Sequence, residues 1–269
     1  MEPISVEQMY GSWLSDEERD TALDRSLGPR SSKSLVDTVE ALGIGPSDTI
    51  LDIGARDGRH SVTLVERLGC NVVAVDPVSG NVDKARELIA ASAYPDRIEA
   101  RHGTIEEIPA EDGSFDLVFS RDMLSHVLDL PAALGECSRV LVGRGRVVVY
   151  QTFATDRLEP REAGAIYANL ALVPERMKPE HFETDASQAG FALESRDVIG
   201  SEWREAWEED GSGRTSRQLL HAARLLRAGD ELAAELGDVP YRVELASALW
   251  GVYQMIGKLE PRIYVLRKG

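Results

Sequence analysis

The chain has 269 residues, of which 43% are hydrophobic, and this length suits one large α/β domain or a domain with a substantial insertion. Its formal net charge of −16 would repel a phosphate backbone, so we expect a small-molecule ligand and no nucleic acid. No apolar run reaches the ~20 residues that span a bilayer, and no basic region followed by an apolar run opens the chain. The sequence therefore predicts a cytoplasmic protein without a membrane partner.

The first 30 residues are rich in charged residues and serine, and apolar residues at helical spacing follow them in "SSKSLVDTVEALGI". Strand-like and helical runs then alternate from "TILDIGA" to "RVVVYQTF", and the strand-like runs are rich in Val, Ile and Leu. Such runs are typical of a parallel sheet that helices cover on both faces. We therefore predict an α/β fold with a doubly wound, mostly parallel sheet.

After Thr155 the alternation loosens. The sequence predicts a helix over 179–189, a strand over 191–200, two helices around 216–236 and 243–256, and a last strand in "RIYVLRK". Residues 201–258 are too many for a hairpin, and their Leu and Ala periodicity needs a surface to pack on. We expect an N-terminal lid segment (1–30), a core (31–200), a helical insertion that acts as a lid (201–258) and the final strand of the core sheet (259–269).

The stretch "ILDIGARDGRH" ends a predicted strand and begins a helix, with glycines at Gly54 and Gly58. In a doubly wound sheet, such a turn lies beyond the carboxyl end of the strand and brings backbone N–H groups close to a ligand. Asp76 ends the next predicted strand, where a carboxylate can accept hydrogen bonds from both hydroxyls of a ribose. A glycine turn alone can reflect tight packing, but the turn together with the acid predicts a nucleoside-containing cofactor.

Four segments, "ILDIGARDGRH", "VVAVDP", "GTIEEIPAEDGSFDLVFSRDMLSHV" and "VLVGRGRVVVYQTF", resemble in order and spacing the motifs of class I S-adenosylmethionine-dependent methyltransferases. The resemblance implies a Rossmann-like, seven-stranded sheet, with S-adenosyl-L-methionine as the cofactor and S-adenosyl-L-homocysteine as its product. By the resemblance, the glycine turn flanks the methionine part of the cofactor, Asp76 takes the ribose and Pro77 packs on the adenine. A dehydrogenase is the rival interpretation, and the absence of the spacing G-x-G-x-x-G argues against it. The cofactor residues that the resemblance implies are Asp52, Gly54, Ala55, Arg56, Gly58, Asp76, Pro77, Thr104, Ile105, Ser120 and Arg121.

Two positions depart from the family pattern. Arg56 stands where the family usually has glycine, and a non-glycine residue tolerates positive φ poorly, so we expect a slightly altered turn. Its guanidinium then lies along the cofactor's carboxylate or in solvent. Thr104 stands where an acid is usual, and its hydroxyl can still reach the adenine amine. We interpret both as variation within a working site.

The segment "SRDMLSHV" places Asp122 and His126 just after the strand end that the resemblance puts nearest the methyl group. It is similar to the segment of phosphoethanolamine N-methyltransferases in which an Asp and a His bind or deprotonate the amine and an N-terminal tyrosine closes over them. The resemblance makes Asp122, His126 and Tyr10 the expected catalytic residues. For His126, a role in capping or packing the start of the helix stays open.

A roof over the methyl group would need apolar and aromatic side chains. The candidates for acceptor binding are Trp13, Met123, Trp250 and Tyr253, and core packing is the alternative for the two late aromatic residues. The histidines and cysteines show no metal-ligand spacing, so we expect no metal.

The sequence thus predicts an enzyme that moves a methyl group to a nitrogen of a small molecule, with an oxygen as the alternative, in bacterial secondary metabolism. A homodimer is left open. The competing interpretation is a non-methylating protein on the same fold, which is either a cyclase or lyase that uses the cofactor's charge or a binding module.

Overall fold

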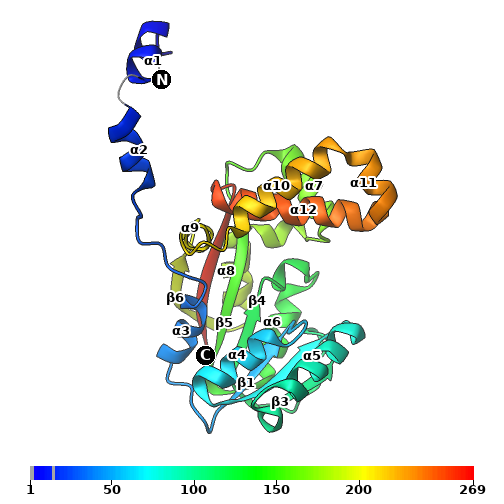
Figure 1. Cartoon of the computed structure of the whole chain (residues 1–269). Coiled ribbons are helices and arrows are strands. Elements are labelled where there is room, and N and C mark those ends of the chain that lie inside the picture. The colour runs from blue at the N-terminus through cyan, green and yellow to red at the C-terminus, as the bar shows by residue number, and fades with distance from the viewer. Residues whose placement is uncertain (1–2, 14–15) are drawn as a thin grey trace.

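The computed structural model describes residues 3–13 and 16–269 and contains a seven-stranded sheet with helices on both faces (Figure 1). The strands are β1 (Thr49–Ile53), β2 (Asn71–Asp76), β3 (Ile98–His102), β4 (Phe115–Arg121), β5 (Leu141–Ala154), β6 (Phe191–Val198) and β7 (Leu259–Lys268). Their order is β3-β2-β1-β4-β5-β7-β6, in which β7 runs antiparallel to both neighbours and the other pairs are parallel. The doubly wound, mostly parallel sheet expected from the sequence is confirmed.

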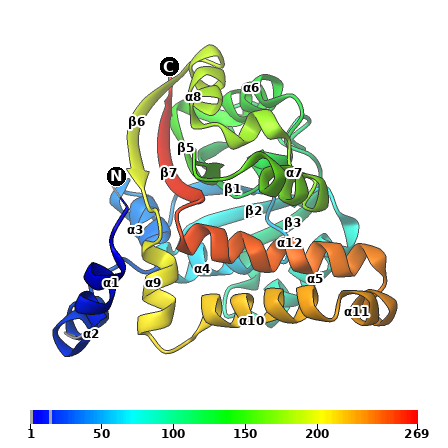
Figure 2. The same cartoon turned by 90° about the horizontal axis from the view of Figure 1, so that it is seen from above.

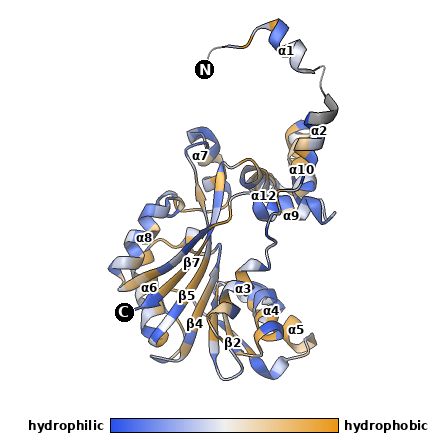
Figure 3. Cartoon of the chain, turned by 90° about the vertical axis from the view of Figure 1, so that its left-hand side faces the viewer, coloured by the Kyte–Doolittle hydropathy of each residue, from blue (hydrophilic) through white to orange (hydrophobic). Residues whose placement is uncertain are grey.

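Helices cover each face of the sheet and bury a separate apolar core against it (Figure 2). On one face lie α3 (Ser34–Ala41), α4 (Arg59–Leu68), α5 (Ser79–Ala91) and α9 (Glu202–Glu209). On the other lie α6 (Leu130–Val140) and α8 (Pro179–Gln188). Figure 3 shows the result, with hydrophobic strands between helices that are hydrophilic on their outer sides. Short 3₁₀ turns are η1 (Pro95–Arg97), η2 (Leu124–His126) and η3 (Pro174–Met177).

Parallel pairing brings the carboxyl ends of the central strands to one edge of the sheet. Ile53, the last residue of β1, pairs with Val75 of β2 on one side and with Ser120 of β4 on the other. Because these strands run in the same direction, the loops that follow them meet at the same edge. The residues in those loops are the ones that the sequence motifs single out.

Four helices lie between β6 and β7: α9, α10 (Arg214–Arg227), α11 (Gly229–Leu236) and α12 (Asp238–Met255). Figure 1 shows α10, α11 and α12 above the strands, and α12 packs on α7 (Pro160–Asn169). The sequence predicted helices between β6 and β7, but it predicted neither α9 nor α7, which precedes β6. It also did not predict that the helix expected over 216–236 is divided before Gly229 into α10 and α11. Within the described ranges, none of the helices has both the length and the apolar character that crossing a membrane requires.

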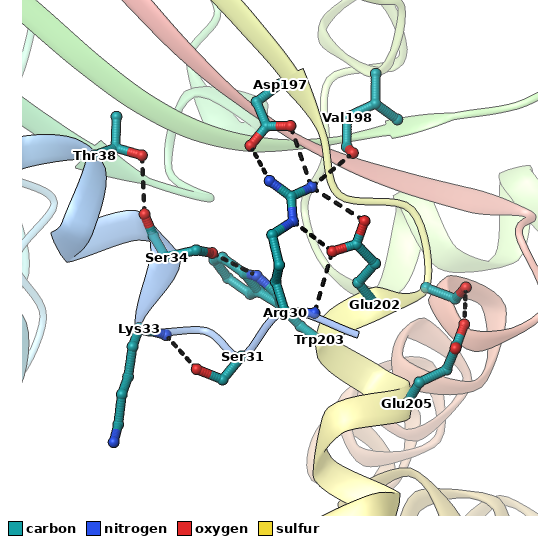
Figure 4. Close-up of polar contacts among 11 residues, drawn as sticks. Arg30, Ser31, Lys33, Ser34, Thr38, Asp197, Val198, Glu202, Trp203 and Glu205 are labelled. Carbon is teal, nitrogen blue, oxygen red and sulfur yellow. Dashed lines mark hydrogen bonds and ion pairs between the residues drawn. The ribbon is translucent and has the colours of Figure 1, made fainter. Parts of the chain in front are cut away.

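The N-terminal segment forms α1 (Val6–Trp13) and α2 (Asp16–Asp24), which lie away from the sheet (Figure 1). Its base is fixed where Arg30 meets the end of β6 and the start of α9 (Figure 4). The guanidinium of Arg30 donates from Nη1 to Asp197 Oδ2 at 2.6 Å and from Nε to Glu202 Oε2 at 2.5 Å. Beside it, Trp203 Nε1 donates to Ser34 Oγ at 3.0 Å. The closure of this segment over the sheet stays a prediction.

Candidate active site

A pocket of about 850 Å³ opens at the edge where β1, β2, β3 and β4 end. Its walls come from the turns after these strands, so segments far apart in the sequence meet there. The expected site residues that line it are Asp52, Gly54, Ala55, Arg56, Asp76, Pro77, Thr104, Ile105, Arg121, Asp122, Met123 and His126.

The turn after β1 is shaped by positive φ angles. Gly54 has φ +73°, and a Cβ added there would lie 2.4 Å from Met123 Cγ, so the position needs glycine. Gly58 has φ +76° and begins α4. Arg56 also adopts a positive φ of 53°, so the left-handed turn is kept with an arginine in it. The N–H of Arg56 donates to Asp76 Oδ2 at 2.8 Å, which stabilises a conformation that costs a non-glycine residue about 1 kcal/mol.

Asp76 joins this turn to the start of α5. Its side chain is 6% exposed, and its Oδ1 accepts hydrogen bonds from Val78 N and Asn81 Nδ2, both at 3.0 Å. With the N–H of Arg56 on Oδ2, three donors fix the carboxylate at the pocket wall. Since a carboxylate offers about four acceptor positions, it retains capacity to bind a ligand hydroxyl.

Asp52 lies deeper, within β1, with 3% of its surface exposed. Its Oδ2 accepts a hydrogen bond from Ser61 Oγ at 2.5 Å, which ties the strand to α4. Burial raises the pKa of this carboxyl to about 6, and the nearby charge of Asp76 acts in the same direction. Asp52 therefore supports the floor of the pocket.

Arg121 ends β4 and is held by uncharged groups. Its Nη1 donates to Nε2 of His60, and its Cζ lies 5.5 Å from the ring centroid of Tyr150 and 5.9 Å from that of Trp203. The two rings stack with centroids 4.5 Å apart and planes 5° apart. Burial, together with the positive charge of Arg121, lowers the pKa of His60 to about 4. His60 is thus neutral near pH 7, and its lone pair orients the guanidinium.

Asp122 is connected to the helical insertion through a chain of hydrogen bonds. It has φ +48°, and its Oδ1 accepts from the backbone N of Thr152 at 2.9 Å. The Thr152 hydroxyl accepts from Gln254 Nε2 at 3.1 Å, and Gln254 Oε1 accepts from Arg204 Nε at 2.7 Å. Burial raises the pKa of the Asp122 carboxyl. The carboxylate is therefore positioned by β5 and, through Gln254, by α9 and α12.

His126 lies in η2 at the rim of the pocket. Its Nδ1 is 3.0 Å from the carbonyl oxygen of Ala171. A carbonyl can only accept, so Nδ1 carries the hydrogen in this contact and Nε2 of the neutral ring has the lone pair. The side chain is exposed, so this basic nitrogen is accessible to a ligand.

Two of the expected cofactor residues do not line the pocket. Gly58 lies behind the turn at the start of α4, and Ser120 lies inside β4 with 1% of its surface exposed. The hydroxyl of Ser120 has no hydrogen-bond partner among the residues that the structure describes. Their contact with a cofactor stays a prediction.

Of the expected acceptor-binding residues, Met123 lines the pocket, whereas Trp250 and Tyr253 do not. Trp250 and Tyr253 lie on α12 and pack against the cluster that contains Ile166 and Leu259. Tyr10 lies on α1 with 57% of its surface exposed, and Figure 1 shows α1 away from the sheet. Trp13 ends α1, and its side chain lies outside the described residues. Their roles in acceptor binding and catalysis stay predictions.

Four residues that shape the site were not predicted from the sequence: Asn81, His60, Tyr150 and Arg204. Asn81 had a local signal, since it stands in the first turn of the helix that follows Asp76. His60 directly follows the glycine turn in the sequence, but its contact with β4 is a tertiary one. Arg204 had no local signal in the sequence, because its partner Gln254 is 50 residues away in the chain. In the described part of the chain, no three side chains of His, Cys, Asp or Glu are grouped so that they could hold a metal ion.

Residues 51–149, which supply β1, β2, β4 and most of the pocket, match a family model described as a methyltransferase domain. The match covers the glycine turn, Asp76 and the Asp122–His126 segment. It confirms the resemblance to methyltransferases that the motifs indicate.

Curated relatives resemble this chain over about half of its length. It is 32% identical over 129 residues to a glycine/sarcosine/dimethylglycine N-methyltransferase of Actinopolyspora halophila, which covers 48% of this chain and 23% of that one. It is 30% identical over 128 residues to a sarcosine/dimethylglycine N-methyltransferase of Halorhodospira halochloris, which covers 47% of this chain and 46% of that one. The chain thus matches less than half the length of these two relatives.

Solved structures share the fold over most of the chain. A geranyl diphosphate C-methyltransferase from Streptomyces coelicolor A3(2) superimposes with a TM-score of 0.64 at 17% identity, covering 88% of this chain and 77% of that one. The [4+2]-cyclase SpnF superimposes with a TM-score of 0.68 at 17% identity, covering 91% of this chain and 84% of that one. The fold of this chain is therefore shared by proteins named as a methyltransferase and as a cyclase.

Proposed function

We propose that this chain is an S-adenosyl-L-methionine-dependent methyltransferase that transfers a methyl group to a nitrogen of a small molecule. One observation carries the proposal: the glycine turn after β1, the carboxylate of Asp76 after β2, and Asp122 with His126 after β4 line a single pocket. The relatives from Actinopolyspora halophila and Halorhodospira halochloris, both named as N-methyltransferases, support the choice of nitrogen.

The residues of the pocket fit this cofactor. Its volume of about 850 Å³ lies within the range of pockets that hold a molecule of this size. Asp76 would accept the ribose hydroxyls, Thr104 and Ile105 would cover the adenine, and the turn at Gly54 would hold the methionine part. The positive φ of Gly54, with Met123 packed against it, keeps the backbone of this turn free of a side chain.

When bound, the cofactor supplies a methyl group on a positively charged sulfur. The task of the chain is to hold an acceptor nitrogen in line with that methyl group and to keep water away. A protonated amine must lose its proton before the nitrogen lone pair can attack the methyl group, and Nε2 of His126 is a base in position at the pocket rim to accept that proton. Asp122 adds a negative charge beside the pocket, which stabilises a cationic amine or sulfonium.

Methyl incorporation from labelled cofactor, measured over a panel of amines, phenols and carboxylates, tests the proposal. We expect labelled product with amines and a His126→Gln variant that binds S-adenosyl-L-homocysteine normally but turns over at least tenfold more slowly. Label confined to phenols or carboxylates would reject the nitrogen acceptor. Cofactor binding without label in any acceptor would favour the non-methylating alternative. An acceptor from bacterial secondary metabolism, a cytoplasmic location and a homodimer stay predictions.

A further inference from the structure

We propose that Arg121 and Arg204 together bind an anionic group of the methyl acceptor, a carboxylate or a phosphate, so that the acceptor is an amine that also carries a negative charge. The proposal rests on the proposed function and names the class of acceptor for that site. It depends on how these two arginines are held and on what lies between them.

Arginines that are partly buried elsewhere in this chain have carboxylate partners. Arg139 pairs with Glu136 at 2.7 Å, and Arg176 pairs with Asp185 at 2.5 Å. Such pairs are easily formed, because the chain has 46 acidic residues and 30 basic ones. Arg121 is also half-buried, yet within residues 3–12 and 19–269 it forms no ion pair with a carboxylate, and its partner is the neutral ring of His60.

Arg204 is held in a similar way. It is half-buried, its Nε donates to Gln254 Oε1 at 2.7 Å, and its Nη1 donates to Gln218 Oε1 at 2.8 Å. Its Cζ lies 4.9 Å from the ring centroid of Trp207. Amide oxygens and ring faces orient a guanidinium without neutralising it, so both arginines retain a full positive charge in a partly dry environment.

The two arginines lie on the same side of the sheet beside Asp122. Tyr150, whose ring lies under Arg121, stands two residues before Thr152 on β5, and Thr152 binds the Gln254 amide that holds Arg204. Both guanidinium groups are close enough to Asp122 to oppose the rise of its carboxyl pKa that burial causes. Arg121 acts on the Asp52 carboxyl in the same way. Neither guanidinium forms a direct ion pair with these carboxylates, so a bound anion would give both arginines a direct partner.

The supports of the pair are arranged in advance of any ligand. A Cβ added at Gly251 of α12 would lie 1.8 Å from Gln218 Oε1, so glycine at this position lets Gln218 approach and hold Arg204. On the other side, Trp203 is fixed to Ser34 (Figure 4), and its ring stacks on Tyr150 beneath Arg121. A site whose donors are already fixed loses little entropy when it binds an anion.

The position of the pair suits the acceptor rather than the cofactor. Arg121, which the resemblance assigns to the cofactor, and Asp122 line the pocket at the end of β4, next to the glycine turn at the end of β1 that would hold the methionine part. Arg204 comes from α9, on the side of the helical insertion. An acceptor that reaches from the pocket toward α9 would bring its anionic group to both guanidinium forks, whose geometry matches a carboxylate or a phosphate.

The experiment is an anion titration of the full-length protein, with and without saturating S-adenosyl-L-homocysteine. The probes are acetate and methyl phosphate against chloride at equal ionic strength, read by tryptophan fluorescence, because Trp203 and Trp207 lie against the two arginines. We expect saturable binding by at least one probe, weakened at least tenfold in Arg121→Gln and in Arg204→Gln. Arg204→Lys, which keeps the charge, should fall between the wild type and Arg204→Gln. The matched control is Arg214→Gln, because Arg214 is exposed and lies at the same 4.9 Å from the Trp207 ring.

Acetate binding alone would indicate a carboxylate acceptor, and methyl phosphate binding alone a phosphorylated one. Anion binding that S-adenosyl-L-homocysteine abolishes would overturn the proposal, since the pair would then hold the cofactor's own carboxylate. Equal affinity in the wild type, Arg204→Gln and Arg204→Lys, or no saturable binding at all, would also overturn it. Anion binding that persists in a protein without methyl transfer to any amine would leave the site intact and contradict the proposed function instead.

Discussion

Replacing His60 by glutamine should change how the stability of the protein depends on pH. Burial and Arg121 lower the pKa of His60 in the folded state to about 4, from an ordinary value of about 6.5. The unfolded chain therefore takes up this proton first as the pH falls, so the stability that His60 contributes is present above about 6.5 and is lost toward 4. At about pH 5.2 these two pKa values favour the protonated unfolded chain by a factor of about 20. The contribution of His60 to the free energy of unfolding is therefore about 2 kcal/mol lower than at about pH 7.5. Glutamine does not titrate, and its amide oxygen can still accept from Arg121.

Urea denaturation of both proteins at about pH 7.5 and about pH 5.2 measures this difference while the pH stays above the sequence pI of about 4.8. The pKa of Asp52 is raised in the folded protein, so protonation of this carboxyl stabilises the folded state as the pH falls. The wild-type pH dependence alone therefore combines two opposite effects. We expect His60→Gln to lose about 2 kcal/mol less than the wild type between the two pH values. If both proteins lose the same free energy of unfolding, His60 is not held neutral by Arg121 and burial.

Three further changes have definite expected results. Gly54→Ala places a Cβ 2.4 Å from Met123 Cγ at φ +73°, so it should lower the free energy of unfolding by about 2–3 kcal/mol and weaken cofactor binding. The control is Gly135→Ala, where no atom lies within 4 Å of the added Cβ. In thermal unfolding this control should be neutral or stabilising by up to about 1 kcal/mol. Arg176→Met removes an ion pair whose side chains are 13% and 16% exposed and should cost about 2–3 kcal/mol in urea denaturation; a loss under about 0.5 kcal/mol would contradict its burial. Asp122→Asn keeps an oxygen for the N–H of Thr152 but removes the negative charge. Turnover should therefore fall at least tenfold, while the Kd for S-adenosyl-L-homocysteine changes less than threefold. If turnover and affinity for S-adenosyl-L-homocysteine fall by the same factor, Asp122 belongs to the cofactor site.

The part of the site that lies after strand ends could be predicted from the sequence, because parallel strands carry their following loops to one edge. Gly54, Asp76 and Asp122 are each identified by a local motif, and the pairing of β1 with β2 and β4 brings them together. The left-handed conformation of Arg56 was harder to foresee. It depends on a hydrogen bond from the N–H of Arg56 to Asp76, which lies 20 residues further along the chain.

The contribution of the helical insertion could not be predicted, because it depends on tertiary contacts without a local signal. Trp203 stands among acidic residues, yet it is 3% exposed and stacks on Tyr150 of β5. Trp250 was a candidate for acceptor binding with core packing as the alternative, and it packs against the cluster that contains Ile166 and Leu259. Amphipathic periodicity predicts that a helix packs on something, but the partner surface follows from the three-dimensional path of the chain.

Isothermal titration with S-adenosyl-L-homocysteine tests most directly whether this pocket holds the cofactor. The wild type should bind with a Kd in the micromolar range, and Asp76→Asn, which keeps an oxygen for the N–H of Arg56, should bind at least tenfold more weakly, about 1.4 kcal/mol. Circular dichroism and thermal unfolding of both proteins serve as the control for folding. A folded wild type that gives no heat of binding, or a folded Asp76→Asn that binds as tightly as the wild type, would contradict the assignment of the cofactor site.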